Sequence, residues 1–347
     1  MAYLISTGGA IPPRAGWVYC TCRCCSFLWR RSCSVIGDCR QFRSRSPGKE
    51  LKKLAMAENL YLHQVQNGKN QWWRYLVGIV TILLIWQVGA GFLIVPILIQ
   101  NQGNLPEKPE PVSFSLFLLG FAFLLFGTWS VNRILHGRSV RSLTTGLERI
   151  HWKRIFFAAG IWMVAVSLVA VVEAVMFPGR YVMNANPAAV LPYFLLGLIL
   201  IPLQTSAEEF FFRGYLLQAS GLLLRNPLLL ALLNGILFTL PHLFNPEVEV
   251  MGMALSAAFY AAMGFFLALL TLRSQGLELA LGIHAGNNFF TAVFANYVTT
   301  ALPSESLFLI QTLDPLFGLA SFVVAAVGVY GVFSLPQLKT LAFGLER

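Results

Sequence analysis

The chain has 347 residues, of which 56% are hydrophobic and 12% are charged, and its mean hydropathy is +0.66. Soluble domains carry about 25% charged residues because their surfaces face water, so the composition excludes soluble globular, disordered and fibrous proteins. The net charge of +10 does not indicate a nucleic-acid partner, because ten of the 25 lysine and arginine residues lie in residues 1–53. We therefore expect an integral membrane protein surrounded by the lipid bilayer.

The first segment, residues 1–56, is basic and contains all six cysteines of the chain. These cysteines lack the two clean ligand pairs of a usual zinc site, so a zinc-binding module is the less favoured alternative. Arginine and serine with few acidic residues also suit a targeting segment. We expect a disordered tail. Because no cysteine follows Cys39, the membrane body holds neither a cysteine nucleophile nor a thiolate metal site.

Eight apolar segments follow the tail, and a transmembrane helix needs about 20 mainly apolar residues. The segments are too long for the strands of a membrane barrel. The expected fold class is therefore all-α, a polytopic membrane helix bundle with about eight transmembrane helices. The segments are residues 75–99, 112–132, 155–177, 187–222, 227–244, 252–272, 277–298 and 305–335.

Basic residues are unevenly divided between the two sets of connecting loops. One side has only Lys108 and Arg180, whereas the loop between the second and third segments alone has six lysine and arginine residues. Because cytoplasmic loops are enriched in these residues, we expect both termini to face the cytoplasm, which an even number of spans allows. The expected location is the plasma (inner) membrane, with an organellar membrane as the alternative.

Ionisable side chains inside the apolar segments are few and lie late in the chain. Such residues are costly in lipid and point to function. These ionisable residues, and one asparagine, occur in three short stretches of sequence. The residues are Glu208, Glu209, Arg213, His242, His284 and Asn288.

Helical spacing suggests a role for each of these groups. Glu209 and Arg213 are four residues apart and can form an ion pair, which leaves Glu208 without that partner and suited to act as a general base for water. His284 and Asn288 share a helix face and can donate hydrogen bonds to an oxyanion. Asn287 could replace Asn288, because a spacing of three also shares a face.

The expected depths of Glu208 and His242 in the membrane are similar, so these two side chains could lie close together. Glu208 lies 17 residues before Arg225 and His242 lies 17 residues after it. In an antiparallel helical hairpin both side chains would then lie about 25 Å from the turn. A structural ion network remains the alternative reading, and Phe238 with its phenylalanine neighbours is more typical of packing.

The three clusters, in this order, resemble the motifs EExxxR (208–213), FxxxH (238–242) and HxxxN (284–288) of the CAAX protease and bacteriocin-processing family, intramembrane glutamic proteases also called the Abi family. The resemblance covers roughly residues 187–298, which we expect to be the catalytic core. Residues 57–180 would form the N-terminal transmembrane helices, and residues 305–347 the last transmembrane helix with a short tail.

The resemblance implies an endopeptidase that cleaves a peptide or protein at the membrane without a cofactor or metal. Glu208 and His242 would activate water, His284 and Asn288 would stabilise the oxyanion, and the supporting residues would be Glu209, Arg213 and Phe238. Two alternatives stay open. One is a zinc protease that uses both histidines and a glutamate, and the other is a non-catalytic immunity, scaffold or transport protein.

Overall fold

A computed structural model describes residues 59–100, 102 and 109–343, all of which belong to one compact unit. The expected tail at residues 1–56 lies outside this part of the chain, so its disorder remains a prediction. The described residues are mainly helical, with little sheet, which confirms the all-α fold of a multi-pass membrane protein.

Six stretches of helix in the described part are long and apolar enough to cross a membrane. The fourth of them, from Pro187 to Ser220, consists of four consecutive helical elements that follow one another without a break. The helices that make up the six stretches are α3 (Trp72–Gln100), α4 (Pro111–Ile134), α6 (Trp152–Met176), η2 (Pro187–Ala189), α7 (Val190–Glu209), η3 (Phe210–Leu216), α8 (Leu217–Ser220), α11 (Met253–Ser274) and α13 (Pro315–Ser334).

The expected number of eight spans is not confirmed. The segments predicted at 227–244 and 277–298 form α9 (Pro227–His242) and α12 (Glu278–Val293), which have 16 residues each. At 1.5 Å per residue these helices are about 24 Å long, shorter than the hydrocarbon core of about 30 Å. Hydropathy locates apolar sequence correctly here but does not show where the helix ends inside it.

The last predicted segment also begins later than expected, at Pro315 instead of residue 305. The Asp314 side chain accepts a hydrogen bond from the Phe317 amide at 3.0 Å and caps α13, and Pro315 occupies the first turn. Both features are typical helix starts. Of the residues that the prediction assigned to this helix before Asp314, Phe308–Ile310 form a strand of a sheet instead.

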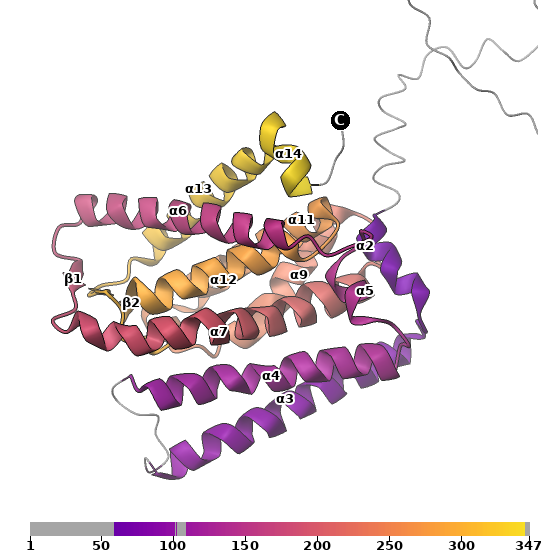
Figure 1. Ribbon diagram of the computed structural model, residues 1–347, viewed down its shortest axis with the longest axis horizontal. Helices are drawn as coiled ribbons and strands as arrows, with labels where there is room; N and C mark the ends of the chain where they lie inside the picture. The colour runs from indigo at the N-terminus through magenta and orange to yellow at the C-terminus, as the bar shows by residue number, and fades with distance from the viewer. Residues whose placement is uncertain (1–58, 101, 103–108, 344–347) are drawn as a thin grey trace, which may run out of the picture. The chain divides into compact units, whose positions relative to one another are not determined.

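This three-stranded sheet was not predicted. It consists of β1 (Tyr181–Met183), β2 (Ala295–Tyr297) and β3 (Phe308–Ile310) in the order β1-β3-β2. β3 pairs antiparallel with β1 and parallel with β2. The sheet ties the connections after α6, after α12 and before α13 together at one end of the helices (Figure 1).

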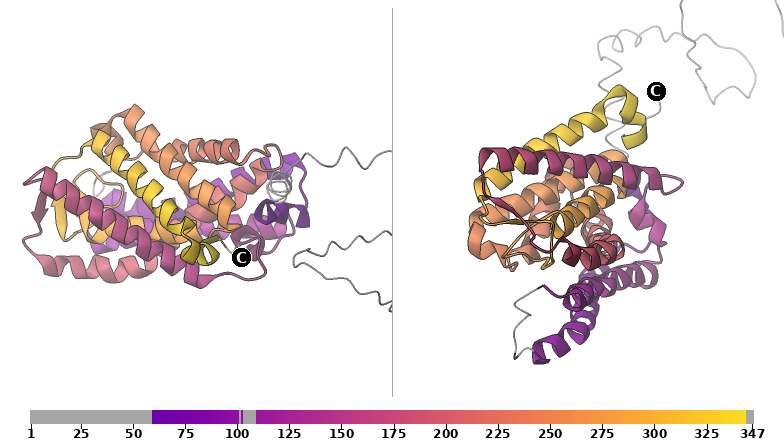
Figure 2. Two further views of the ribbon diagram at one scale, coloured as in Figure 1. Left: turned by 90° about the horizontal axis from the view of Figure 1, so that it is seen from above. Right: turned by 60° about the vertical axis from the view of Figure 1, so that its left-hand side comes forward.

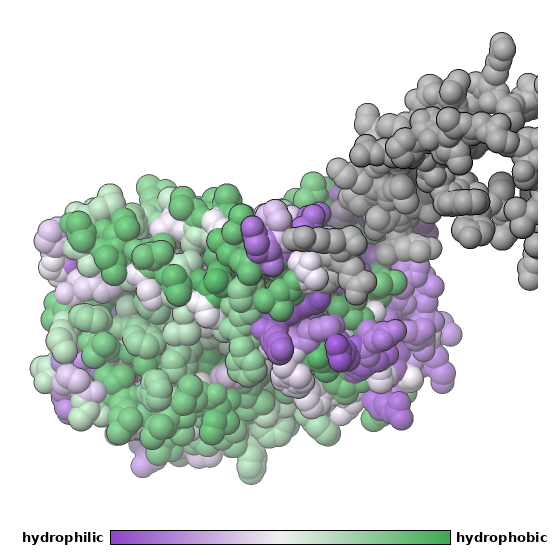
Figure 3. Space-filling view, turned by 45° about the horizontal axis from the view of Figure 1, so that its top comes forward, coloured by the Kyte–Doolittle hydropathy of each residue, from purple (hydrophilic) through white to green (hydrophobic). Residues whose placement is uncertain are grey.

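The opposite end carries α2 (Leu60–His63), η1 (Gln64–Asn67) and α5 (Val140–Thr144), of which α2 and α5 are labelled in Figure 1. Hydrophilic residues gather at this end, whereas apolar residues cover much of the flank seen in Figure 3. Two further short helices are α10 (Glu247–Met251) and α14 (Pro336–Phe343). The distribution of hydropathy is that of a body whose flanks face lipid.

Helices α3 and α4 form a hairpin to one side of the other helices, and α4 connects it to them by packing against α7 (Figures 1 and 2). α12 packs between α6 and α7, and α11 packs against α9. The polar clusters of the sequence lie on α7, η3, α9 and α12. The packing of these helices therefore decides whether the clusters meet.

Candidate active site

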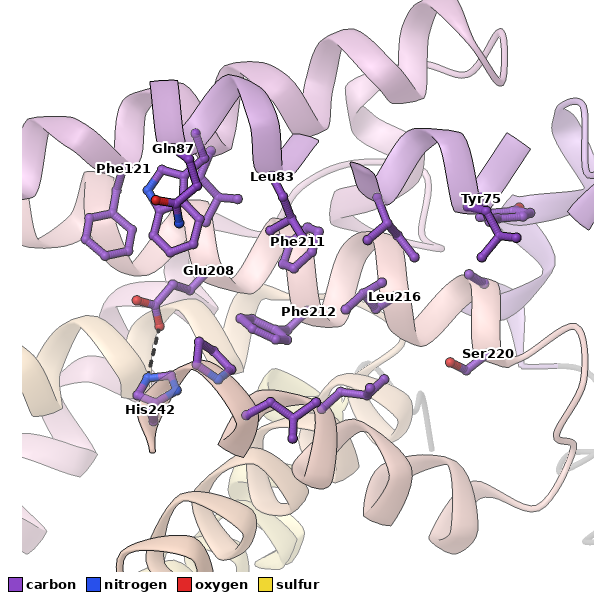
Figure 4. A pocket seen from close by; sticks show the side chains of 18 of the residues that line it. Tyr75, Leu83, Gln87, Phe121, Glu208, Phe211, Phe212, Leu216, Ser220 and His242 are labelled. Carbon is purple, nitrogen blue, oxygen red and sulfur yellow. Dashed lines mark ion pairs between the residues drawn. The ribbon is translucent and has the colours of Figure 1, made fainter. Parts of the chain in front are cut away.

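The structure brings Glu208 and both intramembrane histidines together. Glu208 is in the last turn of α7, His242 ends α9, and His284 is in the second turn of α12. Glu208 Oε2 lies 3.9 Å from His242 Nε2 and 3.7 Å from His284 Nε2. Figure 4 shows the first of these pairs, with the carboxylate facing the imidazole.

Glu209 and Arg213 form the predicted ion pair. Their side chains are completely buried, and Arg213 Nη1 donates to Glu209 Oε1 at 2.8 Å. The residues from Phe210 to Leu216 form a π-helix, a rare geometry that often occurs at functional sites. Burial of both partners makes the pair costly to break, because removing one leaves an uncompensated charge.

Glu209 has a second role that its spacing did not predict. Its Oε1 atom also lies 2.7 Å from His284 Nδ1. Because an ionised carboxylate only accepts hydrogen bonds, Nδ1 of His284 donates the proton of this bond. The ion pair therefore fixes the orientation of the histidine that faces Glu208.

Hydrogen bonding assigns the same ring tautomer to both histidines. His242 Nδ1 lies 2.7 Å from the carbonyl oxygen of Phe238, so this nitrogen also donates. In a neutral ring each Nε2 atom then has no hydrogen and is an acceptor. Both acceptor atoms face Glu208.

Gln204 is a site residue that the search for ionisable groups missed. Its Nε2 donates to Glu208 Oε1 at 2.5 Å, and its Oε1 accepts from Asn288 Nδ2 at 3.1 Å. Gln204 precedes Glu208 by four residues, so the same spacing argument would have found it. This amide connects the candidate base with the candidate oxyanion donor.

The choice between the two neighbouring asparagines follows from their partners. Asn288 contacts Gln204, whereas Asn287 Oδ1 accepts from Trp162 Nε1 at 3.2 Å. Asn287 Nδ2 then donates to Asn288 Oδ1 at 3.2 Å. Asn288 is therefore the asparagine directly connected to the Glu208 cluster.

Aromatic rings hold His242 and Arg213 in place. The His242 ring centroid lies 4.2 Å from that of Phe238 and 4.5 Å from that of Tyr260. The guanidinium carbon of Arg213 lies 4.2 Å from the Phe238 ring centroid, a distance typical of cation–π contacts. Phe238 thus packs, as expected for a phenylalanine, but it packs on two groups of the site.

Two cavities meet at Glu208 and His242. The first, which we call the apolar groove, has a volume of about 890 Å³ and lies between the α3–α4 hairpin and the helices η3, α8 and α9. Figure 4 shows Phe121, Phe211 and Phe212 on its walls, with Glu208 among them.

The second cavity, which we call the polar chamber, has a volume of about 250 Å³. Its lining includes the candidate catalytic residues and further polar side chains from the loops near the sheet. The polar residues that line it are Gln204, Glu208, His242, Asn245, Glu247, Tyr260, His284, Asn287, Asn288, Thr291, Tyr297 and Thr300.

Comparison with known proteins adds a family to this geometry. The family described as type II CAAX prenyl endopeptidase Rce1-like matches residues 187–290. The uncharacterized protein YyaK of Bacillus subtilis (strain 168) is 31% identical over 290 residues, which are 80% of this chain and 95% of the relative. No solved structure matches the chain.

Proposed function

The chain belongs to the CAAX protease and bacteriocin-processing family, a family of membrane proteases, and from this membership we propose that Glu208 carries out glutamic peptide hydrolysis. The observation that carries the proposal is the convergence of Glu208, His242 and His284 inside the helices. Among the residues that the structure describes, Glu208 Oε2 has no hydrogen-bond partner. A buried carboxylate oxygen without a partner is expensive and is available to a substrate water.

In the first step Glu208 activates water. Its distances to the two Nε2 atoms, 3.9 Å and 3.7 Å, exceed a direct hydrogen bond and suit one bridging water. The water donates one hydrogen to Glu208 and one to His242 Nε2. Glu208 takes the proton as the water oxygen attacks the carbonyl carbon of the substrate.

In the second step Asn288 and His284 stabilise the oxyanion. Asn288 Nδ2 has one hydrogen beyond the one it donates to Gln204. His284 Nδ1 is committed to Glu209, so Nε2 donates to the oxyanion only if the ring has first taken a proton from solvent and enters the reaction as an imidazolium. The Glu209 carboxylate, which accepts from Nδ1, would compensate the charge of such a ring.

Collapse of the tetrahedral intermediate completes the reaction. The carbonyl bond re-forms, the carbon–nitrogen bond breaks, and Glu208 returns its proton to the leaving amine. The new carboxylic acid then passes the second proton of the water to the amine, so the products are a carboxylate and an ammonium group, and Glu208 is again ionised. The cycle uses one water and no other reactant.

The substrate reaches Glu208 from the membrane. The apolar groove suits the apolar or lipid-modified part of a membrane-associated peptide or protein, and it leads to Glu208 and His242. We place the end that carries α2 and α5 in the cytoplasm, together with both termini, because hydrophilic residues gather there (Figure 3) and the connection after α4, which includes Arg138 and Arg141, is basic. The plasma (inner) membrane remains the expected location.

Membranes that contain wild type or Glu208→Gln test the proposal. We expect peptide fragments in the wild-type membranes that are absent from the variant, whereas Glu249→Gln, an exposed glutamate, should give the wild-type fragments. Identical fragments from wild type and Glu208→Gln would remove Glu208 as the base. Stoichiometric zinc in purified active protein, with loss of cleavage on chelation, would favour the zinc protease instead.

A further inference from the structure

Glu247 is a second glutamate of the polar chamber, and the proposed reaction does not use it. It begins α10 and is only 3% exposed. Its Oε1 accepts hydrogen bonds from the Tyr260 hydroxyl and from Asn245 Nδ2, the latter at 3.2 Å. Its Oε2 has no hydrogen-bond partner in the described part of the chain.

No cation of the described chain is paired with Glu247. Two other glutamates do have an arginine partner: Arg213 pairs with Glu209, and Arg180 pairs with Glu173 at 2.7 Å. The two partners of Glu247 are neutral donors, which orient a carboxylate but do not compensate its charge. A buried carboxylate without a counter-charge is costly, and a cation supplied from outside relieves that cost.

The polar chamber has the charge that would attract such a cation. Glu208 and Glu247 both line it, and no lysine or arginine is among its lining residues. Its volume of about 250 Å³ equals that of roughly eight water molecules at about 30 Å³ each. A long, flexible basic side chain fits into a space of this size.

Glu247 is also held close to the reacting groups. The ring of Tyr260, whose hydroxyl contacts Glu247, packs against the ring of His242 at 4.5 Å. Asn245 lines both the polar chamber and the apolar groove, as do Glu208 and His242. A peptide that enters along the groove and passes Glu208 would therefore place a nearby side chain beside Glu247.

From these observations we propose that Glu247 binds the ammonium or guanidinium group of a basic residue next to the cleaved bond of the peptide substrate. This inference rests on the proposed protease function and adds a substrate class to it. Tyr260 and Asn245 position the carboxylate, and its free oxygen accepts from the cation. The charge-assisted hydrogen bond gives the site a preference for lysine or arginine.

The experiment uses the full-length protein in liposomes and a library of membrane-anchored peptides that differ at one position at a time. Each position near the cleaved bond carries either lysine or norleucine, which keeps the four-carbon chain and lacks the ammonium group. For at least one position we expect wild type to cleave the lysine peptide at least tenfold more efficiently. In Glu247→Gln this preference should fall to below twofold, mainly through a higher KM for the lysine peptide.

Two controls separate charge recognition from a structural effect. In Glu247→Gln the loss of cleavage should be at least fivefold larger for the lysine peptide than for the norleucine peptide, and Glu249→Gln, at an exposed residue outside the chamber, should keep the lysine preference. The inference is overturned if wild type shows no preference for lysine, or if Glu247→Gln retains it. Cleavage of neither peptide by wild type would contradict the protease function itself and would overturn the inference with it.

Discussion

Two buried polar clusters lie along the same run of helix, near Glu208 and near Gln218, and they differ in how completely their polar atoms are paired. In the first cluster, Glu208, Glu209 and Arg213 each retain a side-chain atom without a hydrogen-bond partner. The second cluster, which we call the end network, lies at the α2–α5 end and consists of Tyr61, His136, Arg138, Tyr215 and Gln218. None of its polar side-chain atoms is among the buried atoms without a partner.

The bonds of the end network show what a structural polar cluster looks like in this molecule. The Tyr61 hydroxyl lies 2.6 Å from the carbonyl oxygen of Leu143 and 3.0 Å from that of Arg213, and its one hydrogen is shared between these two acceptors. Gln218 accepts from Arg138 and donates to the Ser142 carbonyl oxygen at 2.8 Å. Burial with complete pairing stabilises a fold, whereas burial with free atoms leaves groups available for chemistry.

The largest effect on stability and activity together is expected at Glu209, because it forms a buried ion pair with Arg213 and also orients His284. Glu209→Leu leaves Arg213 buried without its counter-charge, which should cost about 3–5 kcal/mol of stability. It also releases His284, so cleavage should be lost. Thermal unfolding and cleavage assays on the same purified sample measure both effects. Unchanged stability would show that Glu209 belongs to the reactive groups alone.

A substitution in the end network should affect stability alone. Gln218→Leu removes the partner of Arg138 and one bond to Ser142, so we expect a loss of about 1–3 kcal/mol. Cleavage per folded molecule should remain at the wild-type level. Chemical unfolding followed by activity measurement on the folded fraction checks this. A large loss of activity in folded protein would contradict the division into two clusters.

A substitution of Gln204, in the cluster near Glu208, should affect activity more than stability. Gln204→Leu removes the bonds to Glu208 and Asn288, and we expect kcat to fall by about tenfold or more, since one charge-assisted bond contributes about 1.5–3 kcal/mol. KM should change little. In Asn288→Ala the same substitution should have a smaller effect, because the two residues share one connection. Additive losses would show that Gln204 does not act through Asn288.

The smallest expected effect is a dependence of protein stability on pH through His136 of the end network. Burial lowers the pKa of His136 from its ordinary value of 6.5, and the charges of Arg138 and Arg74 lower it further. The unfolded chain therefore binds a proton at His136 before the folded protein does, so stability should decrease as pH falls below about 6.5. Thermal unfolding from pH 7.5 to 5 measures this decrease, and His136→Gln should reduce it. An equal decrease in both proteins would assign it to other groups.

Part of the site was predictable because several of its residues are four positions apart on one helix. Glu209 and Arg213 share a helix face, and the matched distances of Glu208 and His242 from Arg225 indicated a common depth. The contact of Glu209 with His284 depends on how α7 packs on α12, which the sequence does not show. Gln204 was missed because the search considered charged groups first, although its spacing from Glu208 is as informative.

The fold was predictable at the level of apolar segments. Helices occur at all eight predicted places, but α9 and α12 are shorter than expected because an apolar residue can continue into a turn or strand. The strands have three residues each, too few to show an alternating pattern. Glu247 is not among the predicted site residues, and only the fold reveals its place in the polar chamber.

The most direct test compares Glu208→Gln with wild type in two measurements on the same preparation, cleavage rate and Tm. Glutamine keeps the shape and the bond to Gln204 but cannot take a proton from water. We expect cleavage to fall by about 10²–10⁴-fold, the usual contribution of a general base, with Tm at or above the wild-type value. Cleavage at the wild-type rate, or a loss of cleavage matched by a loss of folded protein, would contradict the account.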